Sequence, residues 1–181
     1  MQRTVITPAD LSGGALDEVK SWLGISRSQE DALLTDLLLT SVDLCDAFTG
    51  QSPVEQIVEE FIPSTPGAYD LQSRPVKAPI SVQSILNDGT RVPLVPDAFE
   101  FAIDACNGAQ ISLKQTGDAR AVAVTIRAGI APDWESIPKP LKQGIIRLAA
   151  FHYRDREPGQ RETPPTSVAA LWRPWRLTRL T

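Results

Sequence analysis

The side chains best suited to catalysis are sparse in this sequence. His152 is its one histidine, and no Gly-x-Ser-x-Gly motif surrounds a serine that this histidine could activate. Because His152 falls on the apolar face of a predicted helix, we interpret it as a core or interface residue. The glycines form neither a phosphate-binding loop nor a Gly-x-Gly-x-x-Gly motif. We therefore predict a protein that is not an enzyme and that needs no cofactor.

Carboxylates and thiols are the other groups that could do chemistry. The paired carboxylates are neighbours in sequence, a pattern typical of solvated faces and helix starts rather than of acid/base pairs; they are Asp17 with Glu18, Glu30 with Asp31, and Glu59 with Glu60. Cys45 and Cys106 are far from each other in sequence and have no histidine nearby, so neither a zinc site nor a disulfide framework is indicated. We expect both thiols to be reduced and buried.

The stretch from Pro138 to Leu180 is the most distinctive in the chain. A helix is predicted over residues 138 to 157, because prolines suit its first turn and apolar residues then recur at intervals of three and four. Pro158 and Gly159 should end it. After this break, Thr166 or Ser167 can cap a short helix over Val168 to Leu171, and residues 172 to 181 follow as a basic tail.

That tail carries Trp172 and Trp175 together with leucines and arginines, which would form an exposed apolar patch unless something covers it. It either folds back on its own domain or docks on another protein, and Trp and Arg are frequent anchors of protein interfaces. Because Pro174 breaks the short helix, we predict an extended arm with few contacts to the core.

Two helices are predicted before the middle of the chain. The first covers Ala15 to Leu23, and Gly24 fits a left-handed C-terminal cap. The second runs from a cap at Ser28, with Asp31 three residues later, to Gly50. Residues 15 to 50 should therefore form a helical hairpin that packs on the helix at 138 to 157. The residues expected to be buried together are Leu37, Leu38, Phe48, Ile145, Leu148 and Ala149.

Residues 54 to 131 have a composition typical of β-structure, with many prolines, glycines and short runs of valine and isoleucine. Hairpin turns are predicted at Asn87 to Gly89 and at Gln115 to Asp118. In the last strand, valines and an isoleucine alternate with small or polar residues, which predicts one buried and one wet face. The predicted strands lie near 56 to 62, 76 to 86, 91 to 94, 100 to 103, 110 to 113 and 121 to 127.

The predicted fold class is thus α+β: a single domain over residues 1 to 181, with a helical core interrupted by a β-rich insertion. No stretch is apolar enough for a membrane span and no signal peptide is evident, so we expect a soluble protein made inside the cell. Residues 1 to 138 hold 19 acidic and 9 basic side chains, whereas residues 139 to 181 hold 3 and 9. This asymmetry suits contact with acidic neighbours or proximity to nucleic acid, whereas sequence-specific DNA binding is improbable with so acidic a body.

Five segments follow one another along the chain: ALDEVKSWLGI, SQEDALLTDLLLTSVDLCDAFTGQ, RPVKAPISVQSILNDG, IPKPLKQGIIRLAAFHYRDRE and VAALWRPWRLTRL. In this order and spacing they resemble the head-tail connector, or adaptor, proteins of long-tailed bacteriophages and gene transfer agents. The resemblance covers nearly the whole chain. It implies a structural protein of the particle neck that is assembled in the bacterial cytoplasm and forms a twelvefold ring beneath the portal.

By the same resemblance, the ring extends the DNA channel, touches DNA at most non-specifically, and offers a surface to a tail-side neck or stopper protein. The C-terminal helix and tail would reach the portal protein. The alternative is a packaging factor whose basic tail contacts DNA directly. No metal site or membrane contact is implied. The residues that the resemblance assigns to portal binding are Val168, Leu171, Trp172, Arg173, Trp175, Arg176, Leu177, Arg179 and Leu180.

Overall fold

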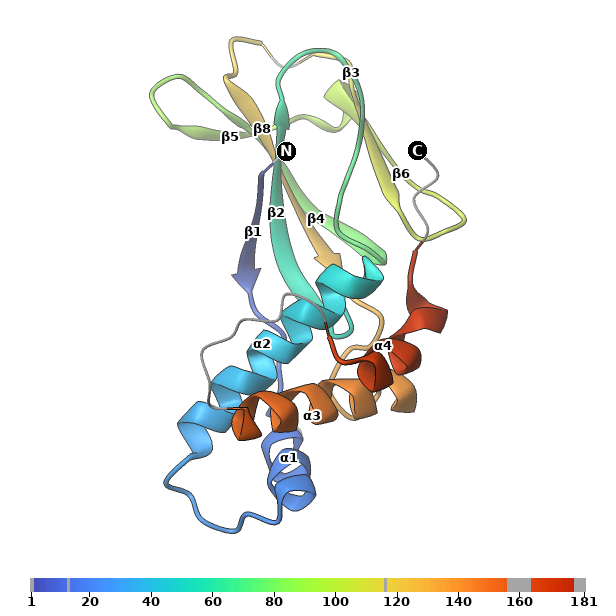
Figure 1. Cartoon of the computed structure of the whole chain (residues 1–181). Coiled ribbons are helices and arrows are strands. Elements are labelled where there is room, and N and C mark those ends of the chain that lie inside the picture. The colour runs from blue at the N-terminus through green and yellow to red at the C-terminus, as the bar shows by residue number, and fades with distance from the viewer. Residues whose placement is uncertain (1, 13, 116, 156–163, 178–181) are drawn as a thin grey trace. The chain divides into compact units, whose positions relative to one another are not determined.

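The computed structural model describes residues 2–12, 14–115, 117–155 and 164–177. Within them the chain forms an α+β fold with helices and antiparallel sheets in two compact units (Figure 1). The helices are α1 (Ala15–Leu23), α2 (Asp31–Thr49), α3 (Lys139–Arg154) and α4 (Thr166–Trp172). The strands are β1 (Gln2–Thr7), β2 (Gln56–Pro63), β3 (Gly67–Asp70), β4 (Val76–Ile85), β5 (Arg91–Pro93), β6 (Phe99–Ile103), β7 (Ala109–Leu113) and β8 (Ala121–Ala128).

The helical unit comprises Ala9–Val54 and Ile130–Thr181. In it α3 packs against α1, α2 and α4 (Figure 1). The predicted packing of the two long helices is confirmed: Leu38 of α2 and Leu148 of α3 belong to one buried cluster, and Leu37 and Phe48 pack against it half-buried. Burial of these apolar faces, rather than helix propensity, stabilises helices of this length.

The start of α2 differs from the prediction. No side chain caps this helix, Glu30 occupies the N-cap position, and Ser28 contributes only its carbonyl oxygen, which accepts a hydrogen bond from the Asp31 amide at 3.2 Å. The Asp31 carboxylate instead pairs with Lys20 of α1, at 2.7 Å. The Asp31 carboxylate therefore forms an ion pair between two helices, and it does not take part in the capping box that the sequence predicts.

The β unit comprises Met1–Pro8 and Glu55–Gly129. Its larger sheet has the antiparallel order β1-β2-β8-β4-β5, so the N-terminal strand pairs with a strand more than fifty residues away in sequence. The predicted hairpin at Asn87 to Gly89 is confirmed: it joins β4 to β5, and the Leu86 amide bonds the Thr90 carbonyl at 2.9 Å. The second sheet has the order β3-β7-β6.

The predicted hairpin at Gln115 to Asp118 is wrong, because the strands on either side of it, β7 and β8, belong to different sheets. The two sheets share one apolar core: Ile111 of β7 and Val124 of β8 are fully buried in the same cluster. Because β7 packs against the larger sheet through this core, it is not hydrogen-bonded to β8 as a hairpin partner. The chain therefore passes from the smaller sheet to the larger one at this turn.

Strand β8 also departs from the predicted alternation. Ala123 and Thr125, expected on a wet face, are 1% and 8% exposed. The reason is position: β8 lies between β2 and β4, and its small residues are flanked by cross-strand neighbours on both sides, among them Phe61 and Gln83 beside Ala123. Cross-strand partners point to the same face of a sheet, so the longer side chains of Phe61 and Gln83 shield the small Ala123 between them from solvent.

The two cysteines lie in different surroundings. Cys45 of α2 is fully buried, as predicted, and burial raises the pKa of its thiol far above its ordinary value. Cys106 is exposed, so the prediction for this residue is wrong. It lies in the turn from β6 to β7, where the carboxylate of Asp104 accepts hydrogen bonds from the amides of Cys106 and Gly108 at 2.7 and 2.9 Å. Cys106 therefore lies in a surface turn rather than on a packed face of a strand or helix, and its thiol stays in contact with solvent.

Candidate docking surface

The C-terminal segment begins with α4, which the structure extends beyond the predicted Val168 to Leu171. Pro165 occupies its N-cap position and no side chain caps it, so neither Thr166 nor Ser167 has the predicted capping role. Val168 and Trp172, four residues apart, are buried against the rest of the helical unit. Because such a pair shares one helix face, the packing of that face holds α4 against α3.

Trp172 is the most deeply embedded residue of this segment, with no exposed surface. Its indole Nε1 donates a hydrogen bond to the carbonyl oxygen of Leu141 at 3.2 Å, and its ring lies 5.9 Å from that of Phe48. Gly144 makes room for it, since a Cβ at that position would come within 3 Å of three indole atoms. Trp172 is therefore a core residue of the helical unit.

The next residues continue along the end of α2. A 3-10 turn covers Arg173–Trp175, and the side-chain amide of Gln51 donates to the Trp175 carbonyl at 2.5 Å. The Leu177 amide donates to the Thr49 carbonyl at 2.8 Å, and the Arg176 guanidinium lies 5.5 Å from the Phe48 ring centre. The Leu177 bond occupies a carbonyl that the end of a helix leaves without an intrahelical donor.

These contacts overturn the prediction of an extended arm for residues 172 to 177. The helix does end as Pro174 approaches, but the chain then bends into a 3-10 turn and packs back on its own unit. The physical reason is that both tryptophans pack against their own helical unit. Trp172 is buried in its apolar cluster, and Trp175 is half-buried beside the same cluster. Arg179 and Leu180 lie outside the described residues.

Of the nine residues assigned to portal binding, the seven that the structure describes fall into three groups. Val168 and Trp172 are buried, and Leu171, Trp175 and Leu177 are half-buried. Arg173 and Arg176 are exposed. In the described part of the segment, the two arginines and the edges of apolar side chains are consequently accessible to a partner. The buried Trp172 anchors this part of the segment to the helical unit.

A groove of about 310 Å³ runs between α1, α3 and α4 in the same unit. Exposed Arg147 and Arg154 lie on either side of half-buried Phe151 along α3. Trp22 of α1, 46% exposed, has its ring 5.5 Å from the guanidinium of Arg147. The groove is completed by Ala150, Pro165, Ser167 and Val168. We call it the α1–α3–α4 groove. The sequence analysis did not predict it, although Arg147, Phe151 and Arg154 follow one another at the i, i+4, i+7 spacing of one helix face.

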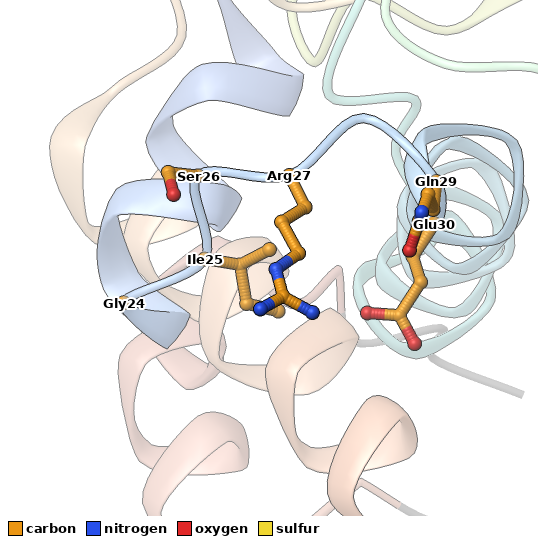
Figure 2. A pocket seen from close by; sticks show the side chains of 6 residues that line it. All are labelled: Gly24, Ile25, Ser26, Arg27, Gln29 and Glu30. Carbon is orange, nitrogen blue, oxygen red and sulfur yellow. The ribbon is translucent and has the colours of Figure 1, made fainter.

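A second hollow, of about 330 Å³, lies in the loop between α1 and α2. Figure 2 shows the side chains of Arg27 and Glu30 extending into the same space below the loop. Glu30 Oε2 accepts a hydrogen bond from the Tyr153 hydroxyl at 2.5 Å, which ties the loop to α3. A carboxylate engaged in this way is a structural group.

The two adjacent carboxylates of β2 are likewise engaged in structure. Glu59 and Glu60 were expected on a solvated face, and this expectation is wrong, because the two residues are 5% and 0% exposed. Glu59 forms a two-pronged ion pair with Arg91 at 2.5 and 3.0 Å, and Glu60 accepts two backbone amide hydrogen bonds. Adjacent strand residues point to opposite faces of the sheet, so these carboxylates cannot act on one substrate. His152 is half-buried rather than buried.

Among the described residues, no group of three or more histidine, cysteine, aspartate or glutamate side chains is placed to hold a metal ion. In the same residues no helix is long and apolar enough to cross a membrane. The surfaces that stand out are therefore the C-terminal segment and the α1–α3–α4 groove, both of which suit contact with another protein.

No family model and no curated protein matches this sequence. Solved structures do match its fold. A chain from the neck of an empty gene transfer agent particle, computed with C6 symmetry, is similar with a TM-score of 0.78 at 19% identity. A chain from the virion of a native gene transfer agent particle gives 0.77 at 20%, and one from the neck of a native particle with C12 symmetry gives 0.76 at 19%. Each match covers 100% of this chain and 98% of the other.

Proposed function

We propose that this protein is a structural component of the neck of a phage-like or gene transfer agent particle, and within the neck a head-tail connector. The observation that carries this proposal is the full-length similarity in fold to chains of gene transfer agent particles, two of them neck chains, at TM-scores of 0.76 to 0.78. A likeness spanning both compact units and nearly the whole of the other chain is more specific than a shared small motif.

The proposed role is to form a ring on the portal protein, extend the DNA channel and present a surface to a tail-side neck or stopper protein. The similar chains come from particles described with C6 and C12 symmetry, which agrees with a ring of twelve. Such a ring requires one surface of each copy to meet a different surface of the next copy. We expect the free protein to be monomeric or weakly associated, with the portal as template for closure.

Within this proposal, the C-terminal segment contacts the portal. Arg173 and Arg176 are exposed on the described part of it, and Arg179 and Leu180 extend the same basic, apolar pattern in the sequence. Trp172 supports the segment from inside its own unit. We therefore assign Trp172 a positioning role and the arginines a contacting role.

The rival role, a packaging factor that binds DNA through basic residues, is weakened by what those residues already contact. Lys142 is 14% exposed and lies within 3.4 Å of both Glu18 and Glu135. The guanidinium groups of Arg147 and Arg176 lie over the rings of Trp22 and Phe48. Cations engaged in this way contribute less to a phosphate-binding surface.

The proposal is tested by mixing the purified protein with portal rings of its own particle. Co-sedimentation at low and moderate salt should persist, and electron microscopy should show an added ring on one face of the portal. Contact through phosphates would instead appear as binding to duplex DNA that falls by orders of magnitude over that salt range. Failure to bind portal rings at either salt concentration would overturn the connector role.

A further inference from the structure

We propose that the α1–α3–α4 groove of one copy binds the extended segment of residues 93 to 97 from a second copy of this chain. In this contact Val95 packs on the aromatic floor of the groove, and the carboxylate of Asp97 pairs with the guanidinium of Arg154. The contact rests on the proposed function only in that identical copies are brought side by side around an axis.

The groove combines aromatic side chains with positive charge. Phe151 is half-buried and Trp22 is 46% exposed, so both rings are accessible from the groove. Arg147 and Arg154 are exposed on either side of Phe151 along α3. No acidic side chain is among the described residues that line the groove. A partner that is apolar and acidic at once is therefore complementary to it.

The size of the groove favours a short extended segment. Its volume of about 310 Å³ is near the lower end of the range of about 300 to 1,000 Å³ that small ligands occupy. A space of this size takes a few side chains rather than a whole helix. Aromatic-lined grooves are recurring binding sites for proline-containing segments, which are extended before they bind and therefore lose little conformational entropy.

Residues 93 to 97 have this chemistry. They read Pro-Leu-Val-Pro-Asp and follow the short edge strand β5. Val95 has φ −66° and ψ 146°, which is the polyproline conformation. It is 64% exposed, more than any other large apolar side chain that the structure describes. Pro93 and Pro96 are three residues apart, which is the period of a polyproline helix.

The segment is preorganised by its own unit. The amide of Leu94 donates to the carbonyl of Val82, and the amide of Ala98 donates to the carbonyl of Val95, each at 2.9 Å. These bonds fix both ends of the segment, so docking costs little further ordering. Asp97 is exposed, and its carboxylate has no ion pair in the described part of the chain.

The spacing of the two surfaces agrees. From Val95 to Asp97 the chain advances by roughly 5 Å, one residue as polyproline and one in the 3-10 turn. From Phe151 to Arg154 it advances by about 4.5 Å along α3. With Val95 on Phe151, the carboxylate of Asp97 is therefore level with Arg154. Arg147 is less suited to this pair, because its guanidinium already lies over the ring of Trp22.

This contact joins two different surfaces, so each copy in a pair keeps either a free groove or a free segment for the next copy. Contacts of this kind continue from copy to copy and close into a ring when the rotation permits. One exposed ion pair contributes little, which agrees with weak association of the free protein. Avidity around a ring can then make the assembly stable without any stronger pair.

The first test traps the contact chemically in the full-length protein. Cys106→Ser removes the exposed thiol, and Val95→Cys and Ser167→Cys, both at exposed positions, are then made in separate proteins. A short bismaleimide should cross-link the mixture of the two but neither protein alone, because position 95 of one copy meets position 167 of the next. Lys139→Cys, exposed at the start of α3 and outside the groove, is the matched control and should not cross-link with Val95→Cys.

The second test is charge reversal in the same thiol proteins. Asp97→Arg in the Val95→Cys protein, or Arg154→Asp in the Ser167→Cys protein, should lower the initial rate of cross-linking about threefold or more, since like charges then face each other. Mixing the two reversed proteins should restore the rate. Circular dichroism of each variant excludes loss of folding as the cause.

The outcomes separate this contact from the connector role. If the mixture cross-links no faster than the control, or if charge reversal leaves the rate unchanged, the contact is wrong, and binding of the unmodified protein to portal rings still supports the connector role. The contact is also wrong if a chain with both thiols cross-links internally while the mixture does not, because the segment then occupies the groove of its own copy. If the mixed proteins cross-link but the unmodified protein does not bind portal rings, the contact stands and the connector role is wrong.

Discussion

Gly144 of α3 lies so close to the indole ring of Trp172 of α4 that no side-chain atom fits between them. A Cβ built on Gly144 would lie 2.1 Å from the indole Nε1 and 2.8 Å from two ring carbons. The glycine is therefore required by a close approach between two helices rather than by backbone conformation. This relationship makes the start of the C-terminal segment part of the folded unit.

Gly144→Ala should destabilise the protein. In an exposed helix this change favours folding by about 1 kcal/mol, but the added methyl here overlaps a rigid, fully buried ring. Overpacking of a core typically costs about 1 to 3 kcal/mol, so the net sign is unfavourable. Thermal unfolding followed by circular dichroism measures this change in stability. Lys139→Ala, an exposed change in the same helix, is the control and should leave the melting temperature nearly unchanged.

Trp172→Ala should cost about 3 to 5 kcal/mol, the usual range for removing a buried tryptophan. A chain that ends at Ala170 should therefore unfold more easily, whereas the extended arm predicted from the sequence would leave the stability of the core nearly unchanged when removed. A chain that ends at Leu177 keeps every described contact of the segment and should melt like the intact protein. If the chain ending at Ala170 melts normally, Trp172 contributes less to the core than its burial indicates.

The chain ending at Leu177 also tests portal binding without disturbing the fold. It lacks Arg179 and Leu180, two of the residues assigned to the portal, and should co-sediment with portal rings much less than the intact protein. Interface anchors are commonly worth about 2 kcal/mol or more each, and the loss is multiplied around a ring. Unchanged co-sedimentation would move the portal contact to another surface.

Glu60→Ala should destabilise the β unit. The buried carboxylate accepts hydrogen bonds from the backbone amides of Gln72 and Ser73 at 2.8 and 2.7 Å. Its removal leaves two donors unsatisfied, at a cost of about 1 to 3 kcal/mol each. Glu100→Ala is the matched control, since that carboxylate is 70% exposed and pairs with Lys114 at the surface. Urea unfolding of both variants compares the two; equal midpoints would contradict the structural role of Glu60.

The turn from β6 to β7 should loosen in acid. The amide of Gly108, and to a smaller extent that of Cys106 and the charge of Arg74, hold the pKa of Asp104 below its ordinary value. Because the folded pKa is lowered, the stabilisation is complete above the ordinary pKa of about 3.9 and is lost as pH falls through the folded value. An NMR titration of the Gly108 amide should show this inflection. Asp104→Asn should abolish it; persistence of the inflection would assign it to another group.

Local pattern in the sequence was sufficient for most elements. The helix over Ala15 to Leu23 was predicted with the bounds that the structure has, and the strand near 121 to 127 differs from β8 by one residue. Periodicity, prolines and left-handed glycines act within a few residues, so they can be interpreted without knowing what lies nearby. The same local pattern missed β3, a strand of four residues whose hydrogen bonds all depend on β7.

Tertiary packing decided the features that carry function. The sequence alone showed two tryptophans near a terminus but could not show that Gly144, twenty-eight residues earlier, leaves room for one of them. Nor could it show that β8 would be covered on both faces, or that Glu59 and Glu60 would be buried with partners far along the chain. Whether a side chain is core or surface depends on which distant groups reach it, and hydrophobic burial and hydrogen bonding determine that only when the chain has folded.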